Sequence, residues 1–193
     1  MAIQRNTLDA YRHVKPYHQG ELSKLCGIYA AINAARLITP ERSDQRELWA
    51  SIYNFAASKL SAKRKLKSAL SDGLSFDAWK HLLHAIYDEL SKRTGQSYHM
   101  RPLIRRSARK RGDLAGAIQA AIDAERPLLC ALSGTLDHYT VIAGYTPSSW
   151  LLHDSCGLRW VVRANTDIGH AGSGRHWIPR PSLVVLYRAE KRI

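Results

Sequence analysis

Hydrophobic residues recur every three or four positions through most of the first two thirds of the chain, which is the spacing of one helix face. This pattern predicts a helix over 24–38, begun by Ser23, and a second helix after Ser43. Ser75 is a good N-cap for a third helix, because its hydroxyl can accept from an unpaired first-turn amide. A fourth helix is predicted after Asp113. The predicted buried face of the third helix comprises Trp79, Leu82, Leu83, Ile86 and Leu90.

The pattern changes near Pro127. Short runs rich in β-branched and aromatic residues follow, separated by Gly, Ser and Pro, as in antiparallel strands joined by short turns. These runs are PLLCAL, HYTVIAGY, SWLLHDS, LRWVVR and SLVVLYR. One more strand, followed by a basic loop, is expected in 97–106, and the composition of 165–176 predicts a loop.

The order of these elements predicts the fold class. Helices come first and strands second, and alternating βαβ units are absent, so we expect an α+β fold rather than a doubly wound parallel sheet. The chain has 193 residues, of which 45% are hydrophobic, enough for one sizeable core. We therefore predict one domain over 1–193, with a helical part at about 20–125 and a sheet part at about 127–190.

Two basic segments dominate the charge of the chain. The net charge is +13, and the segments 59–70 and 101–111 carry eleven positive charges between them. Such clustering indicates an acidic partner: an acidic protein or peptide, an anionic membrane surface, or nucleic acid. A solvated surface that keeps the protein in solution explains the same segments equally well.

The remaining composition narrows the class of protein. No stretch is apolar enough for a membrane helix, and the N-terminal residues lack the apolar region of a signal peptide. We expect a cytoplasmic protein, with export by a route that needs no cleaved leader as the alternative. Three cysteines without a CxxC pair, and histidines without metal-binding spacing, predict neither a disulfide framework nor a metal or organic cofactor.

A cysteine lies where the first long helix is predicted to begin. In QGELSKLCGIYAAINAARL, Cys26 falls in the first turn, where unpaired amides and the helix dipole favour a thiolate. Gly27 would leave space beside the sulfur for a substrate carbonyl. The amide of Cys26 and the side chain of Gln19 could both donate to an oxyanion. A buried structural cysteine is the alternative interpretation.

A histidine and an aspartate frame the second half of the predicted site. In LDHYTVIAGYTPSSWLLHDSCG, His138 opens one strand and Asp154 closes the next, with YTPSS as the turn. The hairpin brings the first residue of one strand beside the last residue of the other, so the carboxylate can orient the imidazole. Strand alternation directs His153 to the opposite face, away from catalysis. Cys156 lies near the site, either as an incidental thiol or as a disulfide partner of Cys26.

These segments resemble the papain-like cysteine peptidases, and most closely the bacterial peptidases that process double-glycine bacteriocin leaders. That pattern has a glutamine, a Cys-Gly at a helix start, a histidine opening a strand and an aspartate ending the next. The resemblance covers roughly residues 15–160. Gln19 stands seven residues before Cys26 where the family usually has six, and Ser155 replaces a frequent proline.

The resemblance implies a papain-like fold and a cysteine-dependent hydrolase, with Cys26 as nucleophile, His138 as base, Asp154 as orienting group and Gln19 as oxyanion donor. The expected reaction is cleavage of a peptide or isopeptide bond through a thioester. Three alternatives stay open: an amidase, an acyltransferase or transglutaminase, and a basic binding module on an inactive peptidase fold. Recruitment of an acidic substrate or a host membrane would suit a bacterial effector.

Overall fold

The computed structural model describes residues 5–20, 24–103, 114–169, 171–172 and 174–189. Its helices are α1 (Cys26–Ile38), α2 (Arg46–Ala62), α3 (Leu66–Ser71), α4 (Phe76–Thr94) and α5 (Leu114–Asp123). Its strands are β1 (Asn6–Thr7), β2 (Tyr98–Pro102), β3 (Leu128–Gly134), β4 (His138–Tyr145), β5 (Ser149–Leu152), β6 (Trp160–Val162), β7 (Thr166–Gly169), β8 (His176–Pro179) and β9 (Val184–Arg188). Short 3-10 turns lie at η1 (Asp9–Arg12), η2 (Pro40–Arg42), η3 (Arg163–Asn165) and η4 (Arg180–Ser182).

The strands form one largely antiparallel sheet. Strands β2, β9, β3, β4, β5 and β6 lie side by side in that order, each antiparallel to its neighbour. β1 pairs with the end of β4, and β8 with the end of β3. The pairing of β7 with β8 is parallel, which departs from the expected antiparallel arrangement.

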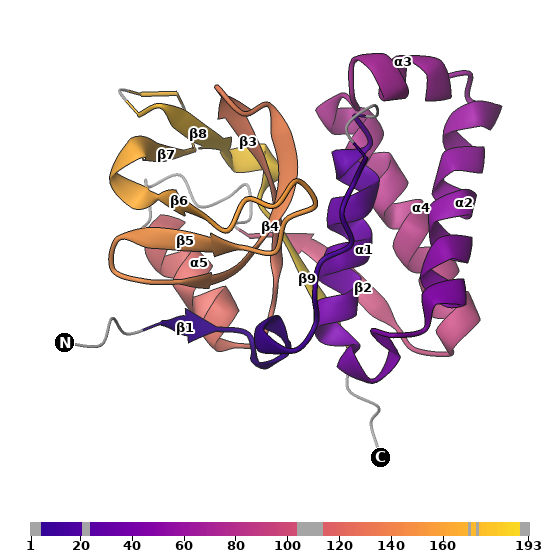
Figure 1. The fold of residues 1–193 in the computed structure, drawn as a ribbon, viewed down its shortest axis with the longest axis horizontal. Coiled ribbons are helices and arrows are strands. Elements are labelled where there is room, and N and C mark those ends of the chain that lie inside the picture. The colour runs from indigo at the N-terminus through magenta and orange to yellow at the C-terminus, as the bar shows by residue number, and fades with distance from the viewer. Residues whose placement is uncertain (1–4, 21–23, 104–113, 170, 173, 190–193) are drawn as a thin grey trace.

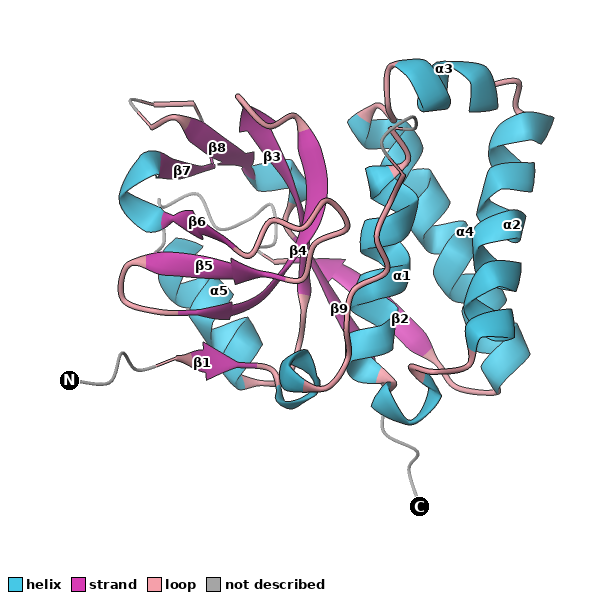
Figure 2. Ribbon diagram, in the orientation of Figure 1, coloured by secondary structure: helices cyan, strands magenta, loops and turns pink. Residues whose placement is uncertain are grey.

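Helices α1 to α4 gather on one side of the sheet (Figure 1). α1 lies nearest and contacts β3, β4 and β9, while α2 and α4 pack against α1. α5 lies apart from the other helices and contacts β1, β3, β4 and β7 (Figure 2). This mixture of helices and antiparallel strands confirms the α+β prediction. The part of the chain at about 20–125, which was expected to be mainly helical, also contributes to the sheet side of the molecule. β2 pairs with β9 in the sheet, and α5 packs against sheet strands rather than against the other helices.

α4 shows how closely local sequence sets an element. The Ser75 hydroxyl accepts from the amide of Ala78 at 3.4 Å, and Gly95 ends the helix with a left-handed φ of 67°. The face that the spacing predicted is the face that is buried. Because α4 packs on both α1 and α2, this face joins the helices into one layer.

A single hydrophobic core runs from the helical layer into the sheet. Its largest fully buried side chains include Trp49, Trp79 and Tyr87 from the helices and Trp150 from β5. β4 is buried along most of its length, because α1 and α5 both pack against it. Strand β4 is therefore a firm support for the residues at its ends.

Several short elements were missed by the sequence pattern. The predicted loop 165–176 contains β7 and the first residue of β8, and the basic segment 59–70 contains α3. β1 has only two residues, and its approach to β4 requires Gly144, where a Cβ would lie 2.7 Å from the Asn6 carbonyl oxygen. Such elements are held by pairing with distant strands, which a local pattern does not record.

Some predictions fall outside the described residues: the Ser23 cap, the Asp113 start of α5, and most of the basic segment 101–111. The helix expected after Ser43 begins at Arg46. Within the described part of the chain, none of the helices combines the length and apolarity needed to cross a bilayer.

Candidate active site

Cys26 is the first residue of α1, which begins two residues after the predicted start at 24. Leu25 is the N-cap, and its carbonyl accepts from the amides of Ile28 and Tyr29, which starts the helix. The Cys26 side chain is 6% exposed and its sulfur lies 3.9 Å from the carbonyl oxygen of Lys24. The sulfur therefore lies at the N-terminal end of α1, where the helix dipole is positive.

The start of α1 is held by residues of α3 and α4. The Lys24 amide donates to the Leu70 carbonyl at 3.1 Å. The Trp79 indole N–H donates to the Gly27 carbonyl at 3.0 Å. A Cβ on Gly27 would lie 2.7 Å from the Trp79 ring, so the space beside Gly27 is filled by Trp79. The expectation that Gly27 leaves room for substrate is wrong: its missing side chain admits the indole.

The same indole connects the start of α1 to β4. The rings of Trp79 and Tyr139 pack with centroids 4.1 Å apart, and the Tyr139 hydroxyl donates to the Leu74 carbonyl at 2.9 Å. Tyr139 follows His138 directly. The helix that carries Cys26 and the strand that begins at His138 are thus fastened to each other through Trp79.

His138 and Asp154 meet as the hairpin predicted. β4 begins at His138, and the β5 pairing continues past its last residue through a hydrogen bond from the His153 amide to the Val141 carbonyl. The Nε2 atom of His138 lies 2.6 Å from the Oδ2 atom of Asp154. The Oδ1 atom of Asp154 accepts from the amides of Cys156 at 2.7 Å and Leu158 at 3.1 Å. Three hydrogen bonds therefore hold this carboxylate in place.

The local electrostatics favour charge on both members of this pair. Burial lowers the pKa of His138, but the hydrogen bond and charge of Asp154, together with the interaction with Cys26, raise it to about 10. Burial raises the pKa of Asp154, but the hydrogen bond from His138, its charge and the Cys156 amide lower that pKa overall. Each group is buried, and each is stabilised in its charged form by the other.

Two thiols, those of Cys26 and Cys156, lie near the His138 imidazole. Cys26 lies close enough to His138 to help raise the pKa of the imidazole, so the three predicted catalytic residues lie at one site. The sulfur of Cys156 lies 3.9 Å from the Nδ1 atom of His138. Both cysteines are free thiols, so the disulfide considered from the sequence is not formed. The position of Cys156 beside the ring is the feature that sequence reasoning left undecided.

Gln19 lies at the edge of this site. Its backbone amide donates to the Ser155 carbonyl at 2.9 Å, so the segment before α1 runs beside the loop that carries Asp154. That segment is fixed to α1 by Asn33, whose side chain exchanges two hydrogen bonds with the backbone of Tyr17, at 2.8 and 3.1 Å. The oxyanion role of the Gln19 side chain stays a prediction.

His153 lies on the opposite face from Asp154, as strand alternation required. It is 2% exposed and its ring packs edge-on against Tyr11 with centroids 6.0 Å apart. Burial first, and then the positive charge of Arg36, lowers its pKa to about 3. His153 and the Asp154 carboxylate that binds His138 are consecutive residues, yet the pKa of His153 is lowered and that of His138 is raised.

The basic segment 59–70 borders a cavity of about 440 Å³ between the end of α2, the turn that follows it and α4. Lys59, Lys63 and Lys65 line it together with His81, and its apolar wall includes Leu60. Ser75 also lines this cavity and follows Leu74, which contacts Tyr139 beside the candidate site. The lysine cavity is therefore joined to the Cys26 region by one short segment.

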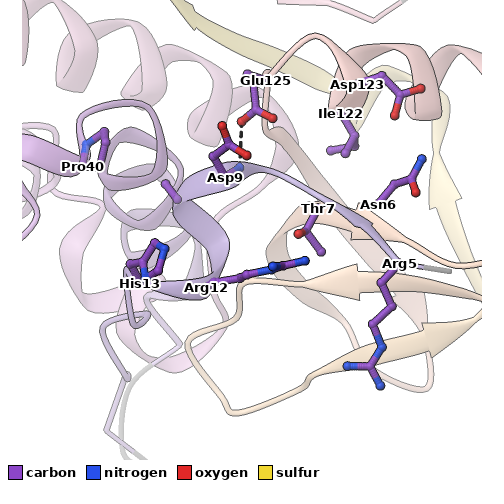
Figure 3. Close-up of a pocket in the computed structure, with 11 residues that line it drawn as sticks. Arg5, Asn6, Thr7, Asp9, Arg12, His13, Pro40, Ile122, Asp123 and Glu125 are labelled. Carbon is purple, nitrogen blue, oxygen red and sulfur yellow. Dashed lines mark hydrogen bonds between the residues drawn. The ribbon is translucent and has the colours of Figure 1, made fainter. Parts of the chain in front are cut away.

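Two other cavities flank the molecule. One of about 260 Å³ is lined by aromatic rings that include Tyr17, Tyr29 and Tyr53, and Tyr29 is one helical turn beyond Cys26. The other, of about 610 Å³, lies between η1 and the end of α5 (Figure 3), where the Asp9 amide donates to Glu125 at 2.9 Å. The lining of this second cavity includes no residue of the predicted triad.

Within the described part of the chain, one group of side chains could hold a metal ion. His138, Asp154 and Cys156 each place one ligand atom within 4.8 Å of the others. Their spacing of 16 and two residues matches no short metal-binding motif, so the sequence contained no signal for it. The grouping depends on the β4–β5 hairpin closing.

Comparison of the chain with protein-family models, with curated proteins and with solved structures gives no match.

Proposed function

We propose that the chain is a papain-like thiol hydrolase with a Cys26–His138–Asp154 triad. The observation that carries this proposal is the position of His138, which is bound to Asp154 through Nε2 and interacts with the Cys26 thiol at the start of α1. The order of these residues resembles the peptidases that process double-glycine leaders. A papain-like fold is part of the proposal, because the α+β arrangement alone does not distinguish it from other mixed folds.

The mechanism follows from the two sides of the His138 ring. Asp154 fixes the ring through Nε2, which leaves Nδ1 to take the proton from Cys26. The thiolate attacks a carbonyl, and the first-turn amides of α1 with Gln19 stabilise the oxyanion. His138 then returns the proton to the leaving amine, and water or another acceptor releases the acyl group from the sulfur.

Cys26, rather than Cys156, is the proposed nucleophile. Burial, together with the negative charge of Asp154, raises the pKa of the Cys156 thiol although His138 lies beside it. Cys26 instead lies at the positive end of a 13-residue helix, next to the same imidazole. The helix dipole acts on one sulfur only, and this difference selects the reactive thiol.

The proposed substrate is a peptide or isopeptide bond in an acidic protein or peptide. The lysine cavity supplies positive charge, and the aromatic cavity that Tyr29 lines could take an apolar side chain. The same triad would serve an amidase or an acyltransferase. These reactions differ only in the acceptor that clears the thioester, so adding a primary amine and identifying the product distinguishes them.

Alkylation with iodoacetamide, followed by mass spectrometry of each cysteine peptide, tests the nucleophile. The reaction is run in chelator-containing buffer at neutral pH. We expect Cys26 to react fastest and His138→Ala to slow that reaction at least about tenfold, since the imidazole is the base. Cys130→Ala is the control, because this thiol is fully buried in β3. Faster reaction at Cys156, or no effect of His138→Ala, contradicts the proposal.

The lysine cavity also supports a second candidate function, a basic binding module on an inactive peptidase fold. Its signature is binding of an anionic partner that weakens with salt and is unchanged by Cys26→Ala. Absence of any thioester on Cys26 with peptide substrates, combined with such binding, would favour this function over hydrolysis.

A further inference from the structure

The two thiols beside His138 suggest a second use of the same site. The Nε2 atom of this ring is taken by Asp154, so the Nδ1 atom is the ring nitrogen that faces the sulfurs. When a metal ion displaces the Nδ1 proton while Nε2 keeps its own, Nδ1 offers an electron pair on the side of Cys156. An imidazole nitrogen and a thiolate sulfur are the ligands that zinc prefers in proteins.

The distance between these two ligand atoms fits a tetrahedral ion. Zn–N bonds of about 2.05 Å and Zn–S bonds of about 2.3 Å at the tetrahedral angle place nitrogen and sulfur about 3.6 Å apart. The observed separation between the His138 nitrogen and the Cys156 sulfur is 3.9 Å. A shift of a few tenths of an ångström at an exposed residue brings them to the bonding arrangement, and Cys156 is exposed.

Asp154 completes the arrangement that metal-binding histidines use. Ligand histidines usually donate their second ring N–H to a carboxylate, which fixes the tautomer and increases the basicity of the ligand nitrogen. Asp154 already occupies that place at 2.6 Å, and its other oxygen is held by the amides of Cys156 and Leu158. Asp154 therefore already holds the His138 ring in one orientation without a bound ion.

We propose that His138 Nδ1, the Cys156 sulfur and the Cys26 sulfur form a binding site for zinc or another thiophilic divalent cation. Cys26 is assigned as the third ligand because it lies at the start of α1 beside the same imidazole. Its sulfur has to move toward Cys156 when the ion binds, since the ligand atoms within 4.8 Å of one another belong to His138, Asp154 and Cys156. Water takes the fourth position. Binding releases to solvent the Nδ1 proton of His138 and every proton still held by the two thiols, and it occupies the sulfur that the hydrolase would use as nucleophile.

The proposal goes beyond hydrolysis and does not depend on it, because the site would bind a cation in an inactive protein as well. In a hydrolase, the bound cation would hold the enzyme inactive until a competing ligand removed it. Cys130, the third thiol, is fully buried in β3 opposite Thr140 and lies outside the site.

Titration with Co²⁺ in place of zinc tests the site without measuring activity. We expect one equivalent to bind the reduced protein and to give a thiolate-to-cobalt absorption band in the near ultraviolet. Cys26→Ala and Cys156→Ala should each halve the band, and zinc should abolish it. Cys130→Ala is the matched control and should leave the band unchanged.

The Asp154→Asn variant refines the test. It keeps the oxygen that the two amides need, while its amide no longer accepts from the ring as the carboxylate does, so zinc affinity should fall about 10- to 100-fold. Circular dichroism of each variant confirms that it is folded. The proposal is overturned if no thiolate band forms, or if the band is unchanged in folded Cys156→Ala.

Discussion

His138 and His153 lie near each other at the ends of one hairpin, and both are buried, yet the structure gives them opposite protonation states. His138 is 9% exposed and His153 is 2% exposed. The pKa of His138 is raised to about 10, whereas that of His153 is lowered to about 3. Burial lowers the pKa of both rings, so burial alone does not distinguish them.

The difference comes from what each ring faces. His138 meets the Asp154 carboxylate at 2.6 Å. Among the described residues, the Nε2 atom of His153 finds no hydrogen-bond partner, and the charges of Arg36 and His18 lower its pKa further. Asp154 and His153 are consecutive, so strand alternation directs the carboxylate to one ring and leaves the other among apolar and cationic groups. The β4–β5 hairpin thus carries one histidine that faces a carboxylate and one that does not.

Removing the charge of Asp154 should have the largest effect, because it removes what distinguishes the two rings. In Asp154→Asn we expect iodoacetamide labelling of Cys26 to slow by about 10²- to 10⁴-fold, since the ring loses both its orientation and its counter-charge. The measurement is the second-order rate constant at Cys26, read by mass spectrometry. Labelling at the wild-type rate would show that Asp154 is not part of a triad.

Replacing His153 should change the dependence of stability on acid. Its folded pKa lies below the unfolded value of 6.5, so the unfolded chain binds the extra proton between those values and stability is lost as pH falls. From pH 6.5 to 4.5 this one group should remove roughly 2 to 3 kcal/mol of the free energy of unfolding. The titration of Asp154 changes stability only below pH 3.8, because its pKa is 3.8 in the unfolded chain and lower in the folded protein.

Urea unfolding at several pH values, in wild type and in His153→Phe, measures this effect. The variant should lose about one proton from the linkage slope between pH 4.5 and 6.5. The rate of Cys26 labelling should be unchanged in the same variant, because His153 faces away from the site. An unchanged slope would mean that His153 titrates normally in the folded protein.

Gly27→Ala should act on the His138 side alone, through packing. The new methyl group would lie 2.7 Å from the Trp79 ring, and we expect a loss of about 1 to 3 kcal/mol in the free energy of unfolding. The loss should be constant over the pH range in which His153 acts. Gly20→Ala is the matched control, because a Cβ there meets no atom within 4 Å. Equal stability of the two variants would show that Trp79 does not fill the space beside Gly27 tightly.

The smallest effect is expected at the lysine cavity, which neither histidine faces. Changing Lys59, Lys63 and Lys65 to Gln should weaken binding of a fluorescent polyglutamate peptide to Cys26→Ala by about 1 kcal/mol, or about fivefold. The control changes Lys15, Lys67 and Lys92, which are exposed and carry the same charge outside the cavity lining. Equal weakening in both triple variants would show a general charge effect rather than a binding cavity.

The local pattern predicted much of this fold and most of the candidate site. The cap and buried face of α4, the helix start at Cys26 and the His138–Asp154 hairpin depend on residues that are close along the chain. The role of Gly27 was misjudged, because the indole that fills its space comes from a residue 52 positions away. β1, β7 and β8 were missed for the same reason, since each is held mainly by pairing with other strands.

By itself, the sequence determined that Cys26 lies in the first turn of α1 and that His138 begins β4, because capping, periodicity and turn chemistry act over a few residues. β5 ends at Leu152, two residues before the predicted end at Asp154. Only the tertiary structure decided that Cys26 and Cys156 approach one imidazole, that Trp79 fastens α1 to β4, and that His153 is buried beside Arg36. These contacts join segments from different elements, so their geometry is set by how the helical layer packs on the sheet.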